Sequence, residues 1–204
     1  MSAEPPRVDS SESIYPPRED TALLLPFAEA SVPGRLLEIG CGSGTLSLAA
    51  ARRGTRVVAT DLNPYALKRL RQAAAGERLP LDLVRTDLAR GLGRFDRILA
   101  NPPYLPTNPQ ARDPDPWHNL AIDGGADGCA VTARILHALP EHLTNTGAAY
   151  VLVSSIQSSA SLRALDDEWR ALGGRRRTAA KRALEGERLE VWLLELGTPR
   201  TVRP

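Results

Sequence analysis

Residues 35–44 read RLLEIGCGSG, and this stretch decides the fold. Its first five residues form a short apolar run that predicts a buried strand, and the glycine-rich turn that follows leads into a helix expected over residues 45–53. A strand, a glycine turn and a helix in this order are typical of a nucleotide-type loop, because glycines let the backbone pass close to a ligand and the first helical amides can meet it. The stretch therefore predicts an α/β fold with a ligand at this turn.

The composition of the turn restricts the ligand. Gly40, Gly42 and Gly44 follow the spacing G-x-G-x-G, whereas dinucleotide-binding folds use G-x-G-x-x-G. Glu38 stands two residues before the first glycine, where its carboxylate would repel a pyrophosphate and would suit a cationic or amino-bearing group. The turn therefore indicates a ligand with such a group.

Three further strands are expected on the C-terminal side of this unit, over residues 56–60, 81–85 and 95–100. A polar residue follows each of them: Asp61, Asp87 and Asn101. Open α/β sheets bind ligands at the carboxyl ends of their strands, so four polar residues in strand order, with Glu38, predict a site. Asp61, at roughly 20 residues beyond the glycine turn, is placed to accept both hydroxyls of a ribose. Its alternative role is a second cap for the helix that follows.

Residues 101–104 read Asn-Pro-Pro-Tyr and end the fourth of these strands. The two prolines remove two backbone donors and hold Asn101 extended, so its amide oxygen and the neighbouring carbonyl of Pro102 have fixed directions. These two acceptors suit a planar NH2 group, with one N–H for each, while the ring of Tyr104 covers the flat face. A side-chain amide and the exocyclic amine of a base both fit this description, and a proline-rich turn without chemistry is the structural alternative.

The composition is that of a soluble globular protein with one domain. The 204 residues are 42% hydrophobic and 25% charged, with a net charge of +2 that neither implies nor excludes a nucleic-acid partner. We expect a disordered tail at residues 1–13 and a single domain at residues 14–198. Cys41 and Cys129 form no CxxC pair, the histidines lack metal-ligand spacing, and no long apolar run suggests a signal peptide or a membrane span. These observations favour a reducing cytoplasm and no metal site.

The second half of the chain predicts a long loop and the remainder of the sheet. Residues 105–126 are rich in Pro and Asp and too long for a simple connector, so we expect a lid or a substrate loop. A helix should run to about Leu139, where Pro140 breaks or kinks it. A buried strand is expected at residues 148–153, an amphipathic helix at 161–172 and a closing strand at 190–196. A basic cluster around residues 175–182 reads as a solvated strand edge, or alternatively as a contact with acidic protein or RNA.

Residues 15–196 resemble the class I S-adenosylmethionine-dependent methyltransferases, and more closely the HemK/PrmC-type glutamine methyltransferases that act on translation release factors. The resemblance rests on the E-x-G-x-G-x-G stretch, the Asn-Pro-Pro-Tyr motif, the lead-in YPPREDT at residues 15–21 and the Asp-Gly-Gly turn at residues 123–125. It implies an α/β fold with a seven-stranded Rossmann-like sheet and helices on both faces. It also implies S-adenosyl-L-methionine as the cofactor.

The resemblance assigns a role to each matching residue. The stretch from Glu38 to Gly44 would wrap the methionine part of the cofactor, Asp61 would hold the ribose hydroxyls, and Asp87 with Leu88 would meet the adenine. The implied cofactor-binding set is Thr21, Glu38, Gly40, Gly42, Gly44, Asp61, Leu62, Asp87, Leu88 and Asn101. The implied catalytic set is Asn101, Pro102 and Tyr104, which would hold the substrate amide and turn its nitrogen toward the methyl group.

The chain lacks the N-terminal helical domain of bacterial PrmC proteins and looks more like the short archaeal and eukaryotic branch. Members of this branch commonly work with a small zinc-binding activator subunit. The resemblance therefore implies an N-methyltransferase that acts on the glutamine of a GGQ motif in a release factor, with such a subunit as partner. An adenine N6 or other nucleic-acid amino methyltransferase, a lysine or small-molecule N-methyltransferase, and a non-catalytic cofactor-binding scaffold are the alternatives.

Overall fold

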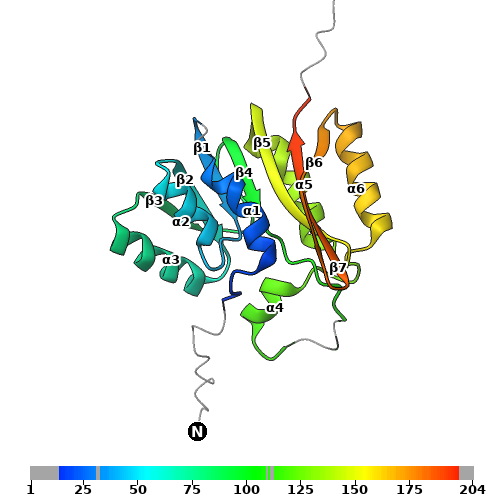
Figure 1. The fold of residues 1–204 in the computed structure, drawn as a ribbon, viewed down its shortest axis with the longest axis horizontal. Helices are drawn as coiled ribbons and strands as arrows, with labels where there is room; N and C mark the ends of the chain where they lie inside the picture. Colours follow the sequence, from blue (N-terminus) through cyan, green and yellow to red (C-terminus); the bar gives the residue numbers. More distant parts are fainter. Residues whose placement is uncertain (1–13, 31–32, 109, 111–112, 198–204) are drawn as a thin grey trace, which may run out of the picture.

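The centre of the computed structural model is one seven-stranded sheet with the strand order β3-β2-β1-β4-β5-β7-β6 (Figure 1). The strands β1 to β5 are parallel, and β7 runs antiparallel to both of its neighbours. The structure describes residues 14–30, 33–108, 110 and 113–197, so the tail expected at residues 1–13 and the domain end at residue 198 lie outside the described residues. The strands are β1 (Arg35–Ile39), β2 (Arg56–Asp61), β3 (Leu81–Arg85), β4 (Phe95–Ala100), β5 (Leu143–Ser154), β6 (Arg175–Leu184) and β7 (Glu187–Glu195).

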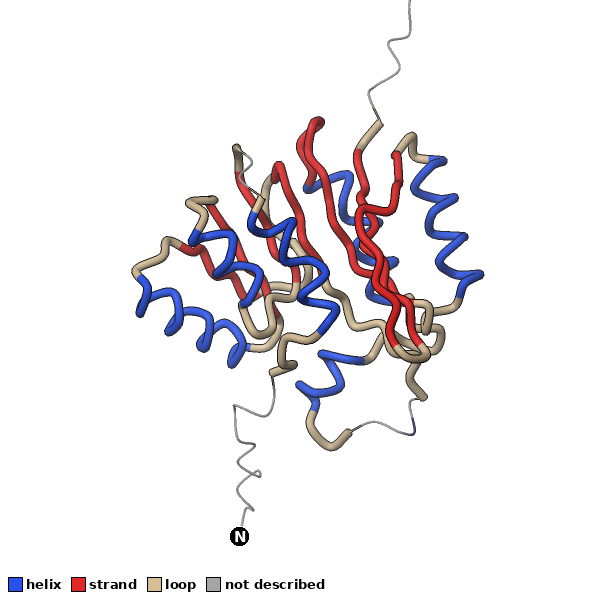
Figure 2. The backbone as a smooth tube through the Cα atoms, viewed as in Figure 1, coloured by secondary structure: helices blue, strands red, loops and turns tan. Residues whose placement is uncertain are grey.

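Helices cover both faces of this sheet (Figure 1). On one face α1 (Glu19–Glu29), α2 (Thr45–Arg52) and α3 (Pro64–Glu77) pack through buried residues such as Leu24, Leu46 and Leu70. On the other face α5 (Ala130–His142) and α6 (Ser159–Ala171) pack through residues such as Ile135 and Trp169. The short α4 (Pro116–Ile122) lies outside these two layers, beyond the loops at the carboxyl ends of the parallel strands (Figure 2). The seven-stranded sheet with helices on both faces confirms the expected fold.

The register of the sheet brings three of the expected site residues to one level. Ile39 at the end of β1 pairs with Thr60 of β2 on one side and with Ala100 of β4 on the other. The next residues along these strands are Gly40, Asp61 and Asn101, which therefore lie at the same edge of the sheet. This alignment follows from the parallel pairing, because equivalent ends of parallel strands meet at the same edge of a sheet.

Some element boundaries differ from the expectation. The helix expected to end near Leu139 continues through Pro140 to His142, because a proline in the last turn removes one backbone donor without stopping the helix. The loop at residues 105–126 contains α4, whose start is capped by the carboxylate of Asp115 accepting a hydrogen bond from Trp117 N–H at 2.9 Å. The strand expected at 148–153 extends over Leu143–Ser154, and the closing strand begins earlier, at Glu187.

Candidate active site

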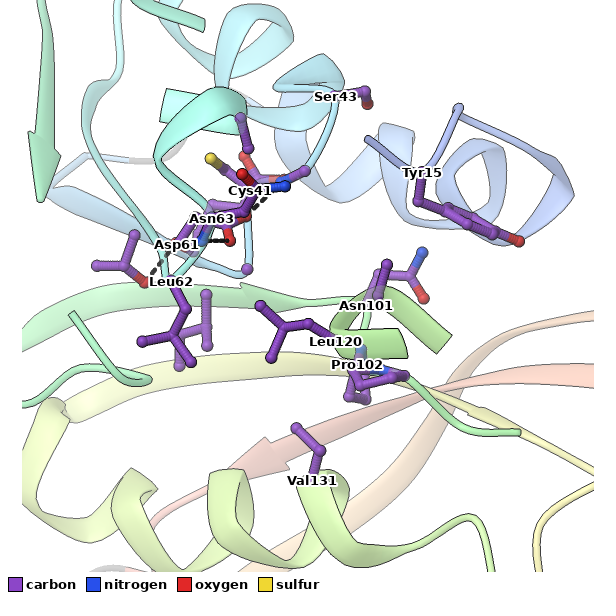
Figure 3. Close-up of a pocket in the computed structure, with 18 of the residues that line it drawn as sticks. Tyr15, Cys41, Ser43, Asp61, Leu62, Asn63, Asn101, Pro102, Leu120 and Val131 are labelled. Atoms are coloured by element: carbon purple, nitrogen blue, oxygen red, sulfur yellow. Dashed lines mark hydrogen bonds between the residues drawn. The ribbon is translucent and has the colours of Figure 1, made fainter. Parts of the chain in front are cut away.

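A pocket opens at the carboxyl ends of the central strands, between the glycine turn after β1 and the segment after β4 (Figure 3). Almost every site residue expected from the sequence lines it: Thr21, Glu38, Gly40, Gly42, Asp61, Leu62, Asp87, Leu88, Asn101, Pro102 and Tyr104. In Figure 3, Asp61 and Leu62 lie toward one end of the pocket, and Asn101 and Tyr15 toward the other. The residues that the sequence singles out therefore lie together around one pocket, with one exception in the glycine turn.

That exception is Gly44. Gly40 and Gly42 have φ values of 71° and 46°, and a Cβ built on either would meet nothing within 4 Å, so their backbones face open space in the pocket. Gly44 also has a positive φ of 79°, but a Cβ there would come within 2.6 Å of the Leu70 side chain. Gly44 is therefore required for the packing of α2 against α3, and it does not line the pocket.

Glu38 is a buried carboxylate at the end of β1. Its Oε2 accepts a hydrogen bond from the Ser47 N–H at 2.9 Å and another from the Ser47 hydroxyl. Burial raises the pKa of Glu38 to about 8, although the bonds from Ser47 oppose that rise and the charge of Asp61 adds to it. A cation bound at this end of the pocket would offset the cost of burying the ionised Glu38 carboxylate.

Asp61 links the ends of β1 and β2. Its Oδ2 accepts from Gly42 N–H at 2.9 Å and its Oδ1 accepts from Asn63 N–H at 2.8 Å. Burial raises the pKa of Asp61, and the backbone donors lower it in part. The carboxylate is thus held by the glycine turn on one side and by the start of α3 on the other. The cap of helix α3 is Asn63, whose Oδ1 accepts a hydrogen bond from Tyr65 N–H at 2.9 Å.

The end of the pocket beyond Asp61 is mostly apolar. Leu62 after β2, Leu120 of α4 and Val131 of α5 all project toward this hollow (Figure 3). Leu88 has a φ of 54°, a strained value for a leucine, and it lies beside Asp87 in the turn that follows β3. Residues with strained backbones often cluster at ligand sites. Asp87 is partly exposed and pairs with Arg134 of α5 at 2.5 Å.

Asn101 carries a buried, unpartnered acceptor. Its Oδ1 is buried and has no hydrogen-bond partner among the described residues, whereas buried polar atoms are nearly always paired. Pro102, the next residue, is buried and has no N–H, so no backbone donor from it can satisfy that oxygen. An unmet acceptor that lines a pocket indicates that its partner is a donor on a ligand.

Tyr15 and Tyr104 line the pocket together with a second buried carboxylate, Asp20, in the first turn of α1. Asp20 is 3% exposed and lines the same pocket as Tyr15 and Tyr104. Burial raises the pKa of both tyrosines, and the negative charge of Asp20 raises it further, so both phenols stay protonated at neutral pH. Thr21 donates to Asp20 Oδ1 from its N–H and from its hydroxyl at 3.2 Å.

Sequence reasoning missed several residues of the pocket. Tyr15 and Asp20 stand in the lead-in motif at residues 15–21, so the motif named their positions but not their place in the site. Arg134 lies on α5 and carries no local signal, because its partner Asp87 is 47 positions away. Ser47 of α2 does not line the pocket but donates to Glu38, which does. Trp117 lies in the part of the chain expected to be a loop, and its ring meets that of Tyr65 edge-on at 6.2 Å.

A family model described as the methyltransferase small domain matches residues 18–162 of the chain. The match covers the glycine turn, the Asn-Pro-Pro-Tyr segment and all the residues that line the pocket except Ile14 and Tyr15. The chain belongs to this methyltransferase family. The pocket at the carboxyl ends of the strands is accordingly the candidate active site of a methyltransferase.

Curated relatives of this methyltransferase carry more specific names. A protein from Methanocaldococcus jannaschii named putative protein N5-glutamine methyltransferase is 38% identical over 145 residues, which are 70% of this chain and 73% of the relative. The mouse methyltransferase HEMK2 is 34% identical over 68% of this chain and 71% of its own length. The release factor glutamine methyltransferase of Geobacter sulfurreducens is 33% identical over 66% of this chain but 51% of its own length. The match thus spans about half of that bacterial protein.

A solved structure resembles the methyltransferase over most of the chain. It is the Mtq2-Trm112 complex of E. cuniculi, described as responsible for methylation of the eRF1 translation termination factor. Its matching chain gives a TM-score of 0.70 at 26% identity, with 91% of this chain and 99% of that chain covered. A methyltransferase from Pyrococcus furiosus, at 18% identity and a TM-score of 0.63, shares the fold.

Two negative findings apply to the described residues. None of their helices is both long and apolar enough to cross a bilayer. Nor do three or more His, Cys, Asp or Glu side chains among these residues gather in a way that could hold a metal ion.

Proposed function

We propose that this methyltransferase transfers a methyl group from S-adenosyl-L-methionine to the side-chain amide nitrogen of a glutamine in a translation release factor. The observation that carries the proposal is the buried, unpartnered Oδ1 of Asn101 beside Pro102 in the pocket. The names of the relatives support glutamine as the acceptor, since two of the three curated relatives described above are named glutamine methyltransferases.

The pocket fits the proposed cofactor. Gly40 and Gly42 leave open space where a side chain would stand, which admits a ligand against the backbone of the turn. Glu38 offers a carboxylate to the ammonium of the methionine part, and Asp61 offers another to the two ribose hydroxyls. Thr21, Leu62, Asp87 and Leu88 complete the lining around the cofactor. When bound, the cofactor supplies an electrophilic methyl group on a positively charged sulfur.

The residues after β4 would bind and orient the acceptor. Asn101 Oδ1 and the Pro102 carbonyl each accept one N–H of the amide, which fixes the amide plane so that the nitrogen lone pair, perpendicular to that plane, points toward the methyl group. The ring of Tyr104 lies against the flat face of the amide and fixes its plane. The new N–C bond makes the amide nitrogen strongly acidic, so it loses one proton to water without a strong base in the site.

A small partner subunit is part of the proposal. The solved relative Mtq2 was determined in complex with Trm112, and the present chain covers 99% of the matching chain of that structure. The match to a bacterial release factor methyltransferase spans about half of that protein. We place the protein in the cytoplasm, where release factors act.

The decisive experiment is methylation of the release factor from the same host. The purified protein, with and without proteins that co-purify from that host, is incubated with the cofactor and with the release factor, and the Gly-Gly-Gln peptide is examined by mass spectrometry. We expect a gain of one methyl group on the glutamine. A factor in which glutamine is replaced by norleucine is the matched control. Methylation of lysine in the same factor, or of adenine in added RNA, with the glutamine unchanged, would refute the proposal.

A further inference from the structure

Basic side chains gather on β6, which forms one edge of the sheet beside β7 (Figure 1). Arg177 and Arg182 are exposed there, and the proposed mechanism uses neither of them. Arg177 is level with Leu193 of β7, which is level with Tyr150 of β5. Paired residues of neighbouring strands point to the same face of a sheet. Arg177 therefore lies on the face where the ring of Tyr150 stacks on Phe27 of α1 at 4.4 Å.

A bulge in β6 brings Arg182 to the same face. Side chains alternate between the two faces along a strand, so residues five positions apart normally point to opposite sides. The register of β6 shifts between Thr178 and Ala180, and one extra residue there moves the alternation by one position. Arg182 is consequently level with Leu189, which belongs to the buried cluster that α1 shares with the sheet. Arg177 and Arg182 thus form a basic row on the α1 face.

The two faces of β6 differ in how their charges are balanced. On the opposite face Arg176 lies 2.7 Å from Asp166 of α6, and Lys181 and Arg188 lie 3.5 and 3.4 Å from Glu190. The two arginines of the basic row form no ion pair with any described residue. Positive charge is therefore balanced on one face of the strand and left open on the other.

The basic row reaches the edge of the sheet at which the pocket opens. Arg182 is level with Leu189, and Leu189 is level with Ser154, the last residue of β5. Three strand spacings, about 14 Å, separate β6 from β4, whose end carries Asn101. This separation is well within the area that a protein covers in a stable interface, roughly 800 Å² on each partner. A protein that places a side chain beside Asn101 can therefore also contact β6.

The surroundings of the basic row favour a protein over a nucleic acid as its partner. A phosphate backbone carries a charge at every step and would also meet Glu185 and Glu195, which lie near the two ends of β6. The net charge of +2 gives little general attraction for a polyanion. A folded protein can instead present carboxylates at the two guanidinium groups alone, and each guanidinium can bind a carboxylate through two parallel hydrogen bonds.

We propose that Arg177 and Arg182 are a docking surface for an acidic region of the protein that carries the acceptor side chain. The inference rests on the proposed function and extends it from the acceptor glutamine to the surface around that glutamine. It implies that the methyltransferase binds the folded acceptor protein more tightly than a short peptide of the same local sequence.

The double variant Arg177→Gln/Arg182→Gln tests the docking surface. We expect its KM for the folded release factor to rise about fivefold, the loss expected for two exposed ion pairs, with kcat unchanged. The KM for a short Gly-Gly-Gln peptide should stay the same, because the peptide lacks the acidic region. Added salt should raise the KM of the wild type for the folded factor more steeply than that of the variant. An unchanged KM for the folded factor, or an equal loss with the peptide, would overturn the proposal.

A matched control removes two charges from the opposite face of the same hairpin. The double variant Lys181→Gln/Arg188→Gln changes the net charge by the same amount, but both side chains already face Glu190. It should leave the KM for the folded factor unchanged. A rise as large as the one for the basic row would show that net charge, and not the α1 face of β6, sets the affinity, and it would also overturn the proposal.

A binding measurement without methyl transfer separates this inference from the proposed function. If the wild type methylates no glutamine, the proposed function fails, but fluorescence anisotropy at low salt still tests the basic row with a poly-glutamate peptide and a uridine oligonucleotide of equal charge. We expect the peptide to bind the Arg177/Arg182 variant more weakly than it binds the wild type and the control. Equal binding to all three proteins would overturn the proposal. Tighter binding of the oligonucleotide, lost in the same variant, would make a nucleic acid the partner and would overturn it as well.

Discussion

The carbonyl oxygen of Tyr104 lies directly against the α-carbon of Gly128, where a Cβ would come within 2.4 Å of it. Gly128 has a φ of 75°, and its own carbonyl accepts a hydrogen bond from Gln157 Nε2 at 2.8 Å. The turn that ends at Gly128 is further tied to the segment after Tyr104, since Gly124 N–H donates to the Leu105 carbonyl at 2.9 Å. This turn therefore supports the backbone that aims Asn101 and Pro102.

The first prediction concerns this support. Gly128→Ala should lower the free energy of unfolding by about 3 kcal/mol, because a positive φ costs an L-residue about 1–2 kcal/mol and the clash with Tyr104 costs about as much again. Turnover should fall more than cofactor affinity, because the clash displaces the backbone of Tyr104, which lies in the segment proposed to hold the acceptor. Urea unfolding, kinetics and calorimetry measure the three quantities.

Gly54 provides the control for that variant. It has a φ of 80°, but nothing lies within 4 Å of a Cβ built there, and it is remote from the pocket in the turn between α2 and β2. Gly54→Ala should therefore lose only about 1–2 kcal/mol of stability and keep full turnover. Equal effects of the two substitutions would show that the contact with Tyr104 has no special role.

The second prediction concerns Asp61. Asp61→Ala should weaken cofactor binding by about 1–3 kcal/mol, because it removes a carboxylate that serves two hydroxyls and also releases the amide of Gly42. Calorimetry gives the affinity directly. Asp82→Ala, at an exposed position of β3, is the matched control and should bind as the wild type does. Unchanged affinity in Asp61→Ala would remove this residue from the site.

The third prediction separates chemistry from binding. Asn101→Ala should reduce single-turnover rates by more than tenfold, about 1.4 kcal/mol on the barrier, and leave cofactor affinity nearly unchanged. The reason is that Asn101 Oδ1 lies at the acceptor end of the pocket and has no partner among the described residues. Asn145→Ala, at an exposed site in β5, controls for the loss of an amide. A fall of less than tenfold in the single-turnover rate would show that Asn101 does not hold the acceptor amide.

The sheet and the pocket were predictable because their signals are local. The apolar run before Gly40 and the polar residue at the end of each strand are read directly from the sequence, and parallel pairing then brings Gly40, Asp61 and Asn101 to one level. Helix α4 was missed because the Pro- and Asp-rich stretch has no apolar period, although Asp115 followed by Pro116 is a helix-start signal.

Contacts between distant segments were beyond sequence reasoning. The packing of Gly44 on Leu70 and of Gly128 on Tyr104 depends on how helices and turns dock, and no local pattern encodes that docking. Tyr15 and Tyr104 likewise line one pocket although almost 90 positions separate them, a distance in sequence that a spacing argument does not cover.

The last prediction follows from the pKa of Glu38, which burial raises from 4.5 to about 8. The folded protein then binds one more proton than the unfolded chain between these two pH values, so the stability of the ligand-free protein should fall as the pH rises from 4.5 to about 8. The cofactor's ammonium would favour the ionised form, so binding should release a proton below about pH 8 and tighten as the pH rises toward that value. Calorimetry in two buffers with different ionisation enthalpies measures the proton release. Glu38→Gln should abolish both the release and the pH dependence of stability in this range, and a wild-type binding enthalpy that is the same in both buffers would show that Glu38 does not meet the ammonium.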